Sequence, residues 1–227
     1  MDDRTRTALI VTGISCLVLV DSLLADLPLV AAGAKVFASC GFLAVAILAG
    51  ALESTYGRVL LFGLALSFLG DVFLIGETQR AFLGGLTAFL LAHLAYVTAF
   101  VVVGVNLRWM ALAALPIIGC AIVVASWLGP HTPQELTLPV YIYTTVISVM
   151  VITAFGTRGM GAPTLILAGA LMFFLSDLSV ALARLVHTDF PNYVWGLPLY
   201  YAGQLCLALS VSQARYHALP QPSKSDR

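Results

Sequence analysis

The feature that most constrains this chain is a succession of long apolar runs separated by short turn segments. Eight such runs follow one another, each of about 18 residues or more, which is enough to cross a hydrocarbon core of ~30 Å as a helix. The breaks between them carry turn chemistry, as in "GPHTPQE" and "GTRGMGAP". The predicted spans are 8–25, 29–51, 58–76, 81–104, 108–128, 138–155, 163–184 and 195–214.

Composition supports the same class of protein. Hydrophobic residues make up 60% of the 227 residues and charged residues only 10%, whereas soluble domains carry about 25% charged residues. The sequence therefore predicts an all-α, polytopic transmembrane helical bundle, with one eight-span domain over 1–214 and a polar tail over 215–227. Membrane lipids surround such a bundle. No basic run suggests nucleic acid as a partner, and no protein partner is evident.

Arginine and lysine are distributed unequally between the two sides of the predicted bundle. Arg80 and Arg184 fall on one side. The cations on the side of the two termini are Arg4, Arg6, Arg58, Arg108, Arg158, Arg215, Lys224 and Arg227. Because cytoplasmic loops carry the excess of Lys and Arg, this asymmetry predicts a multi-pass protein of the cell membrane with both termini in the cytoplasm.

Polar residues inside the spans gather at one depth. Asp71 lies thirteen residues after Arg58, about 20 Å along its helix, and Asp177 lies fourteen residues after Pro163, at nearly the same level. A charge inside hydrocarbon costs about 2.5–3.5 kcal/mol on the insertion scale, so a layer of ionisable groups indicates a functional site. Three further residues are predicted to share this layer: Asp21, Lys35 and Tyr200.

A short internal echo pairs the two aspartates. "GLALSFLGD" (63–71) and "GALMFFLSD" (169–177) share Gly, Phe, Leu and Asp at identical offsets. Their separation of 106 residues is about half the chain, which predicts two related halves of four helices. An even number of spans in each half makes the repeats parallel, with their axis along the membrane normal. The repeat therefore predicts that Asp71 and Asp177 face one another across the central axis.

Two carboxylates that share a site of low dielectric do not both ionise readily, which leaves an acid beside a carboxylate. Such a pair provides a general acid together with a base or charge stabiliser, and suits hydrolysis through a cationic intermediate. The alternative is a packing role, in which each aspartate hydrogen-bonds across a helix interface or pairs with Lys35.

Four segments in this order resemble the YhhN family of membrane lysoplasmalogenases: "ALSFLGDVFLI", "FLGGLTAFLLAHLAYVTAF", "GALMFFLSDLSVA" and "LPLYYAGQLCLALSV". The resemblance extends from Lys35 to Val211. It implies a lysophospholipid substrate and hydrolysis of the vinyl ether bond of lysoplasmalogens, which releases a fatty aldehyde and a glycerophospho-alcohol. It also implies that Asp71 and Asp177 are the catalytic pair. The family's second-span motif usually reads Lys-Pro, whereas here Val36 follows the lysine.

Other polar residues are candidates for the same site. Lys35 is expected to bind the lipid phosphate or to hold one aspartate ionised, with a lysine that snorkels to the outer interface as the alternative. Ser67 shares a helix face with Asp71 at i, i+4 and is expected to orient it, unless its hydroxyl bonds its own backbone. Asp21 is a candidate substrate contact from the first span, at the depth of the two aspartates.

The fourth and eighth spans add further candidates. His93 and Tyr96 lie deeper in the bundle, where a packing histidine with satisfied nitrogens is favoured over a substrate contact. Tyr200 and Gln204 occupy one face of the last span and are expected to contact substrate or water, since the family carries a glutamine there. Aromatic residues near the outer helix ends are interpreted as interfacial belt residues: Tyr141, Tyr143, Tyr193 and Trp195.

Two functions of other classes remain open at this stage. A small proton-coupled transporter also has intramembrane acids and parallel halves, although no span is interrupted by Gly-Pro pairs at matching places. A zinc-dependent hydrolase is suggested by Ser67 and Asp71, but zinc requires several imidazole or thiolate ligands, and His93 alone of the four histidines falls inside a span. We therefore expect neither a metal nor another cofactor.

Overall fold

The computed structural model describes residues 1–186, 188 and 190–218 of the chain. This part contains eight α-helices and no strand, and every helix is long and apolar enough to cross a membrane. The prediction of an all-α bundle of eight spans is confirmed. The helices are α1 (Asp3–Leu24), α2 (Pro28–Leu48), α3 (Thr55–Phe73), α4 (Gln79–Val103), α5 (Leu107–Leu128), α6 (Gln134–Arg158), α7 (Thr164–Ala181) and α8 (Tyr193–Ala218).

Polar capping residues set where several helices begin. The hydroxyl of Ser54 accepts a hydrogen bond from the backbone N–H of Gly57 at 2.9 Å before α3. Thr78 does the same for Ala81 at 3.1 Å before α4. Each cap satisfies one of the N–H groups that the first turn leaves without a partner. Pro28 opens α2 at a first-turn position, where its missing N–H costs no hydrogen bond.

Several helices extend beyond the predicted spans. The largest difference is α6, which was predicted over 138–155 and runs from Gln134 to Arg158. Hydropathy marks only the apolar part of a helix, whereas its polar ends continue into the headgroup region. At the end of α7 the chain continues as a π-helical turn, Leu182–Val186, and α8 continues to Ala218 into the predicted tail. The rest of that tail lies outside the described residues.

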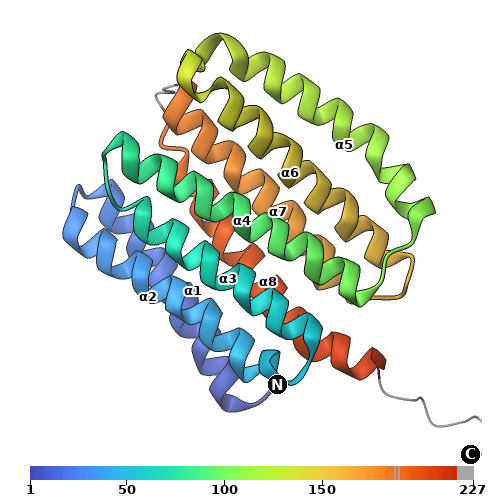
Figure 1. Ribbon diagram of the computed structural model, residues 1–227. Helices are drawn as coiled ribbons and strands as arrows, with labels where there is room; N and C mark the ends of the chain where they lie inside the picture. The colour runs from blue at the N-terminus through green and yellow to red at the C-terminus, as the bar shows by residue number, and fades with distance from the viewer. Residues whose placement is uncertain (187, 189, 219–227) are drawn as a thin grey trace, which may run out of the picture.

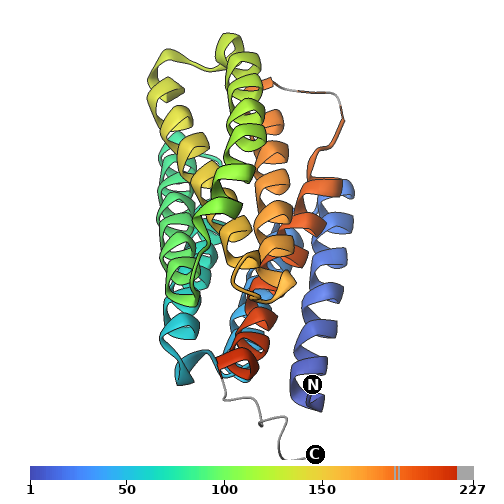
Figure 2. The same cartoon turned by 90° about the vertical axis from the view of Figure 1, so that its right-hand side faces the viewer.

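Helices α1–α4 and α5–α8 form the two halves of the chain. Helices α5, α6 and α7 lie on one side of α4, whereas α8 lies behind α3, close to α1 and α2 (Figure 1). Consecutive helices pack on one another within each half, and between the halves α4 packs on α6 and α8 packs on α2. These two contacts exchange when the halves are exchanged, as expected for parallel repeats. Helix α8 packs in addition on α1 and α3, whereas in the described part of the chain α4 makes no comparable contact with α5 or α7. The N-terminus and the C-terminal end of α8 lie at the same end of the bundle (Figure 2).

Helices α7 and α8 approach one another closely at two glycines. A Cβ atom on Gly169 would lie 2.8 Å from the carbonyl oxygen of Gly203, and a Cβ atom on Gly203 would lie 3.0 Å from the carbonyl oxygen of Gly169. Small residues at such a crossing allow the two backbones to meet directly, which is a common way to join membrane helices. This contact fixes the helix that carries Asp177 against the helix that carries Tyr200.

Candidate active site

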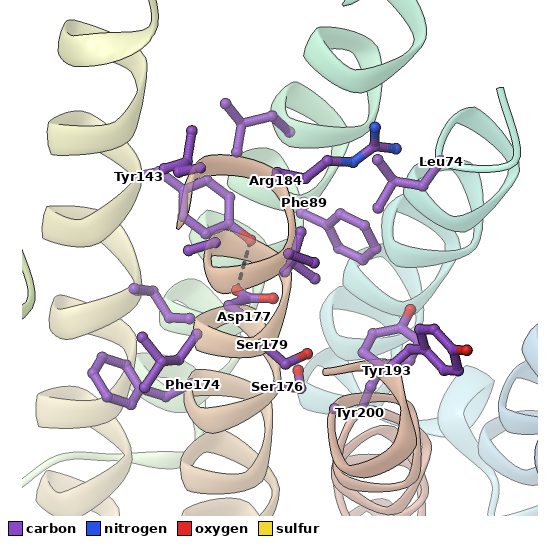
Figure 3. Close-up of a pocket in the computed structure, with 18 of the residues that line it drawn as sticks. Leu74, Phe89, Tyr143, Phe174, Ser176, Asp177, Ser179, Arg184, Tyr193 and Tyr200 are labelled. Atoms are coloured by element: carbon purple, nitrogen blue, oxygen red, sulfur yellow. Dashed lines mark hydrogen bonds between the residues drawn. The ribbon is translucent and has the colours of Figure 1, made fainter. Parts of the chain in front are cut away.

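A cavity of about 330 Å³ lies between the two halves near the ends of α3 and α7. Most of its wall is apolar, with side chains such as Phe89, Ile147 and Phe174. Both predicted catalytic aspartates line it, and Figure 3 shows Asp177 facing into it from α7. The other ionisable or hydroxyl-bearing residues on its wall are Lys35, Tyr143, Thr144, Ser176, Ser179, Arg184, Tyr193 and Tyr200.

Asp71 is held by two hydroxyl groups from other helices. It is buried, with 3% of its surface exposed. Its Oδ2 atom accepts hydrogen bonds from Ser39 Oγ on α2 and from the Tyr200 hydroxyl on α8, both at 2.7 Å. The charge of Lys35, one turn before Ser39 on α2, acts on this carboxylate. Two donors and a nearby cation offset part of the cost of burying the anionic form of Asp71.

Asp177 has a different set of neighbours. The Tyr143 hydroxyl on α6 donates to its Oδ2 atom at 2.6 Å (Figure 3). His93 Nε2 on α4 lies 3.6 Å from the same oxygen, beyond hydrogen-bond distance. The Asp177 side chain is 16% exposed, and the charge of Asp71 acts on it. Asp177 thus accepts one hydroxyl hydrogen bond where Asp71 accepts two.

The two aspartates have equivalent settings in the two halves. Asp71 on α3 accepts a hydrogen bond from Ser39 on α2, the preceding helix of its own half. It accepts another from Tyr200 on α8, the last helix of the other half. Asp177 on α7 accepts a hydrogen bond from Tyr143 on α6, the preceding helix of its own half. His93 lies near it on α4, the last helix of the other half. Each aspartate thus has a hydroxyl donor on the preceding helix of its own half and a polar neighbour on the last helix of the other half. Both carboxylates line one cavity.

A buried polar network lies behind Asp71, away from the cavity. The Ser67 and Tyr96 hydroxyls are 3.0 Å apart, and the Tyr96 hydroxyl donates to Gln204 Oε1 at 2.9 Å. Ser67 was predicted to orient Asp71 directly, but its partner is Tyr96. Gln204 does not line the cavity, and its Nε2 atom is buried without a hydrogen-bond partner among the described residues. Ser67 likewise does not line the cavity.

His93 and Asp21 also depart from the sequence-based expectations. His93 is fully buried, yet neither ring nitrogen has a hydrogen-bond partner in the described part of the chain. Its ring packs against Tyr143 and Phe173 and does not line the cavity, as the packing interpretation expects, but its nitrogens are not satisfied there, and the charged group beside it is Asp177. Asp21 is exposed on α1 and does not line the cavity, so the structure does not bring it to the site.

The model of the YhhN family matches residues 30–211. This chain belongs to the YhhN family. Among curated proteins, it is 29% identical over 164 residues to "Lysoplasmalogenase TMEM86A" of Bos taurus, which covers 67% of this chain and 65% of the relative. It is 33% identical over 160 residues to the Homo sapiens protein of the same name, with the same coverage.

A bacterial relative gives a similar result. "Lysoplasmalogenase" of Mycobacterium bovis is 32% identical over 171 residues, which covers 70% of this chain and 62% of the relative. The chain thus spans slightly less than two thirds of the length of these curated relatives. No solved structure matches it.

In this YhhN-family chain, Lys35 lies at the cavity although Val36 replaces the family's proline. Helix α2 continues without interruption through this position. In the described residues, no carboxylate lies within 4.0 Å of the Lys35 ammonium, so the alternative of a direct ion pair with Asp71 is not what the structure shows.

Sequence reasoning missed two hydroxyl donors to the aspartates. Ser39 follows Lys35 by one turn on α2, and this i, i+4 spacing from a buried lysine was a usable signal. Tyr143 was interpreted as an interfacial belt residue. It lies nine residues after Gln134, the first residue of α6, which is ~14 Å along that helix. Ser39 lies eleven residues after Pro28 on α2, so a depth count places both hydroxyl groups near the aspartate layer but does not give the direction in which either side chain points.

Proposed function

We propose that this protein hydrolyses the vinyl ether bond of lysoplasmalogens by acid–base catalysis with Asp177 and Asp71. The observation that carries the proposal is the pair of carboxylates that line one apolar cavity, each accepting a hydrogen bond from a hydroxyl donor. The printed names of the relatives, lysoplasmalogenases, supply the substrate class. An apolar wall suits the alkenyl chain, and an acid with a carboxylate suits the reacting bond.

The hydrogen bonds distinguish the roles of the two aspartates. Asp71 accepts from Ser39 and Tyr200 and is acted on by the charge of Lys35, which stabilises its anionic form. Asp177 accepts a single hydroxyl hydrogen bond, from Tyr143, and its Oδ1 atom remains to carry a proton. Since two such carboxylates do not ionise together readily, Asp177 is the acid and Asp71 the carboxylate.

The reaction then runs in three steps. Asp177 donates its proton to the vinyl carbon distal to the ether oxygen, and the π electrons form the new C–H bond. This leaves an oxocarbenium ion at the proximal carbon, which the negative charge of Asp71 stabilises. Water adds to that carbon while the Asp177 carboxylate takes a proton from it. The hemiacetal passes its hydroxyl proton to the glycerol oxygen as the C–O bond breaks, which gives aldehyde and alcohol.

Substrate selectivity tests this function. Purified protein incubated with lysoplasmenyl-ethanolamine should release fatty aldehyde, whereas the saturated 1-alkyl analogue should release none, because only a vinyl ether can be protonated to an oxocarbenium ion. Aldehyde is measured by mass spectrometry after derivatisation. Absence of aldehyde from both lipids, together with proton-coupled uptake in liposomes, would instead support the transporter.

The proposal includes an orientation with both termini in the cytoplasm. Arg58 and Arg108 begin α3 and α5 at the end of the bundle where α1 starts, whereas Arg80 begins α4 at the opposite end. Of the cations used for this prediction, Lys224 and Arg227 lie outside the described residues.

A reporter fused after the last residue should therefore read cytoplasmic, because the positive-inside rule sets orientation. A reporter inserted at 130–133, between α5 and α6, should read external. The measurement is a paired alkaline phosphatase and green fluorescent protein fusion at each site. The opposite pattern would place the cavity in the inner leaflet.

The residues present do not fit a zinc site. Across 1–186, 188 and 190–218, no three His, Cys, Asp or Glu side chains come together as candidate metal ligands. Structural and catalytic zinc sites need at least three protein ligands. We therefore assign no step of the reaction to a metal.

A further inference from the structure

We propose that Arg184, together with Lys35, binds the phosphate group of the substrate at the mouth of the cavity. This inference rests on the proposed function and specifies its substrate as a phosphate-bearing, single-chain lipid. Sequence analysis used Arg184 only to set the orientation in the membrane, and no role at the site was predicted for it.

The position of Arg184 is set by the end of α7. It lies in the π-helical turn Leu182–Val186, seven residues after Asp177, which corresponds to ~10 Å along a helix. π-helical turns are rare and occur frequently at functional sites. Arg184 lines the same cavity as Asp177. Figure 3 shows its guanidinium turned away from that carboxylate, toward the outer part of the cavity.

The Arg184 guanidinium is held in place by an aromatic ring. Its central carbon lies 5.3 Å from the centroid of the Phe82 ring, in the first turn of α4. A guanidinium over a ring face within about 6 Å makes a favourable cation–π contact. This contact leaves the N–H groups at the edge of the guanidinium plane for an anion. Planar guanidinium groups bind phosphate oxygens in pairs.

A second positive charge faces the same space. Lys35 lines the same cavity from α2. Two cations near one another repel, and the repulsion is stronger beside an apolar wall than in water. Among the described residues, neither cation has a carboxylate within 4.0 Å. The monoanionic phosphodiester of the substrate, placed between the two cations, would offset this repulsion and accept hydrogen bonds from both.

The distances match a lysophospholipid. Seven bonds separate the vinyl carbon that receives the proton from the phosphorus atom, which is roughly 9 Å in an extended chain of bonds of ~1.5 Å. The backbone positions of Asp177 and Arg184 are separated by seven residues, a rise of ~10 Å, which is of the same order. A lipid with its vinyl ether at Asp177 would therefore have its phosphate near the level of Arg184, with its alkyl chain along the apolar wall.

The test compares two vinyl ethers that differ in the phosphate. We would measure aldehyde release from lysoplasmenyl-ethanolamine and from 1-alkenylglycerol, which has no phosphate, with the natural protein and with Arg184→Gln. The variant should raise KM for the phospholipid about tenfold, leave its kcat within about threefold, and leave turnover of 1-alkenylglycerol unchanged. Arg184→Lys should show an intermediate KM. Arg80→Gln, an exposed arginine at the same end of the bundle that does not line the cavity, is the control.

Equal effects of Arg184→Gln on both substrates, or no effect on either, would overturn the phosphate site while the proposed hydrolysis stands. If the natural protein releases aldehyde from neither substrate, the proposed function fails. Binding of the non-hydrolysable 1-alkyl lysophospholipid then tests the site by itself. Arg184→Gln should weaken that binding about tenfold and leave binding of 1-alkylglycerol unchanged, and equal binding by the two proteins would refute the site.

Discussion

Asp177→Asn and Asp71→Asn should each lower kcat by at least about a hundredfold, the lower end of what one acid–base group contributes. Asparagine at position 177 has no proton of suitable acidity for the vinyl carbon. Asparagine at position 71 has no negative charge to stabilise the oxocarbenium ion. Steady-state aldehyde release in detergent micelles measures both effects. The double variant should be little slower than either single one, because groups that act as a unit are strongly non-additive.

Both variants should remain folded, since a neutral amide costs less than a charge in an apolar environment. Thermal unfolding and size-exclusion profiles check this point. Asp21→Asn is the matched control, because Asp21 is exposed on α1 at a similar depth and does not line the cavity. Near-normal turnover by a well-folded Asp71→Asn or Asp177→Asn protein would mean that the aspartates serve packing.

Tyr200→Phe should lower kcat by about tenfold to a hundredfold. Its hydroxyl donates to Asp71 at 2.7 Å, and a hydrogen bond to a charged group is worth about 1.5–3 kcal/mol. Tyr143→Phe should have a smaller effect, because its partner Asp177 is the neutral acid in the resting state and gains charge only during the reaction. Initial rates over a range of pH measure both variants.

The pH profile separates orientation from packing. Loss of a hydroxyl donor to Asp71 makes its anion less stable, so activity of Tyr200→Phe should require a higher pH than that of the natural protein. Tyr141→Phe is the control, since Tyr141 is 45% exposed on the same helix as Tyr143. An unchanged pH profile with reduced kcat in Tyr200→Phe would assign the tyrosine to packing against Phe89 and Phe173.

The bundle and the aspartate pair were accessible from sequence for simple physical reasons. A bilayer requires apolar runs of fixed length, so counting residues locates eight helices. The cost of a charge in hydrocarbon makes Asp71 and Asp177 conspicuous. The echo around them then predicts their opposition across the two halves.

The hydrogen-bond partners of the two aspartates could not be predicted in the same way. Counting residues gives the depth of a side chain in the membrane, but not the direction in which that side chain points from the helix axis. Lipid is as apolar as a protein core, so the apolar residues of a membrane helix do not reveal which face is buried. Asp21 shows the consequence. Leu19 is fully buried, and two residues further the helix has turned by about 200°, which directs Asp21 away from the bundle.

The most direct test of the account is hydrolysis of lysoplasmenyl-ethanolamine in D2O, with the aldehyde reduced in situ and examined for deuterium. Proton transfer from a single fixed acid, Asp177, to one face of the vinyl group predicts one deuterium on the carbon next to the carbonyl, in a single stereoisomer. An aldehyde without deuterium, or with the label divided equally between the two stereoisomers, would contradict enzymatic protonation by a positioned carboxylic acid.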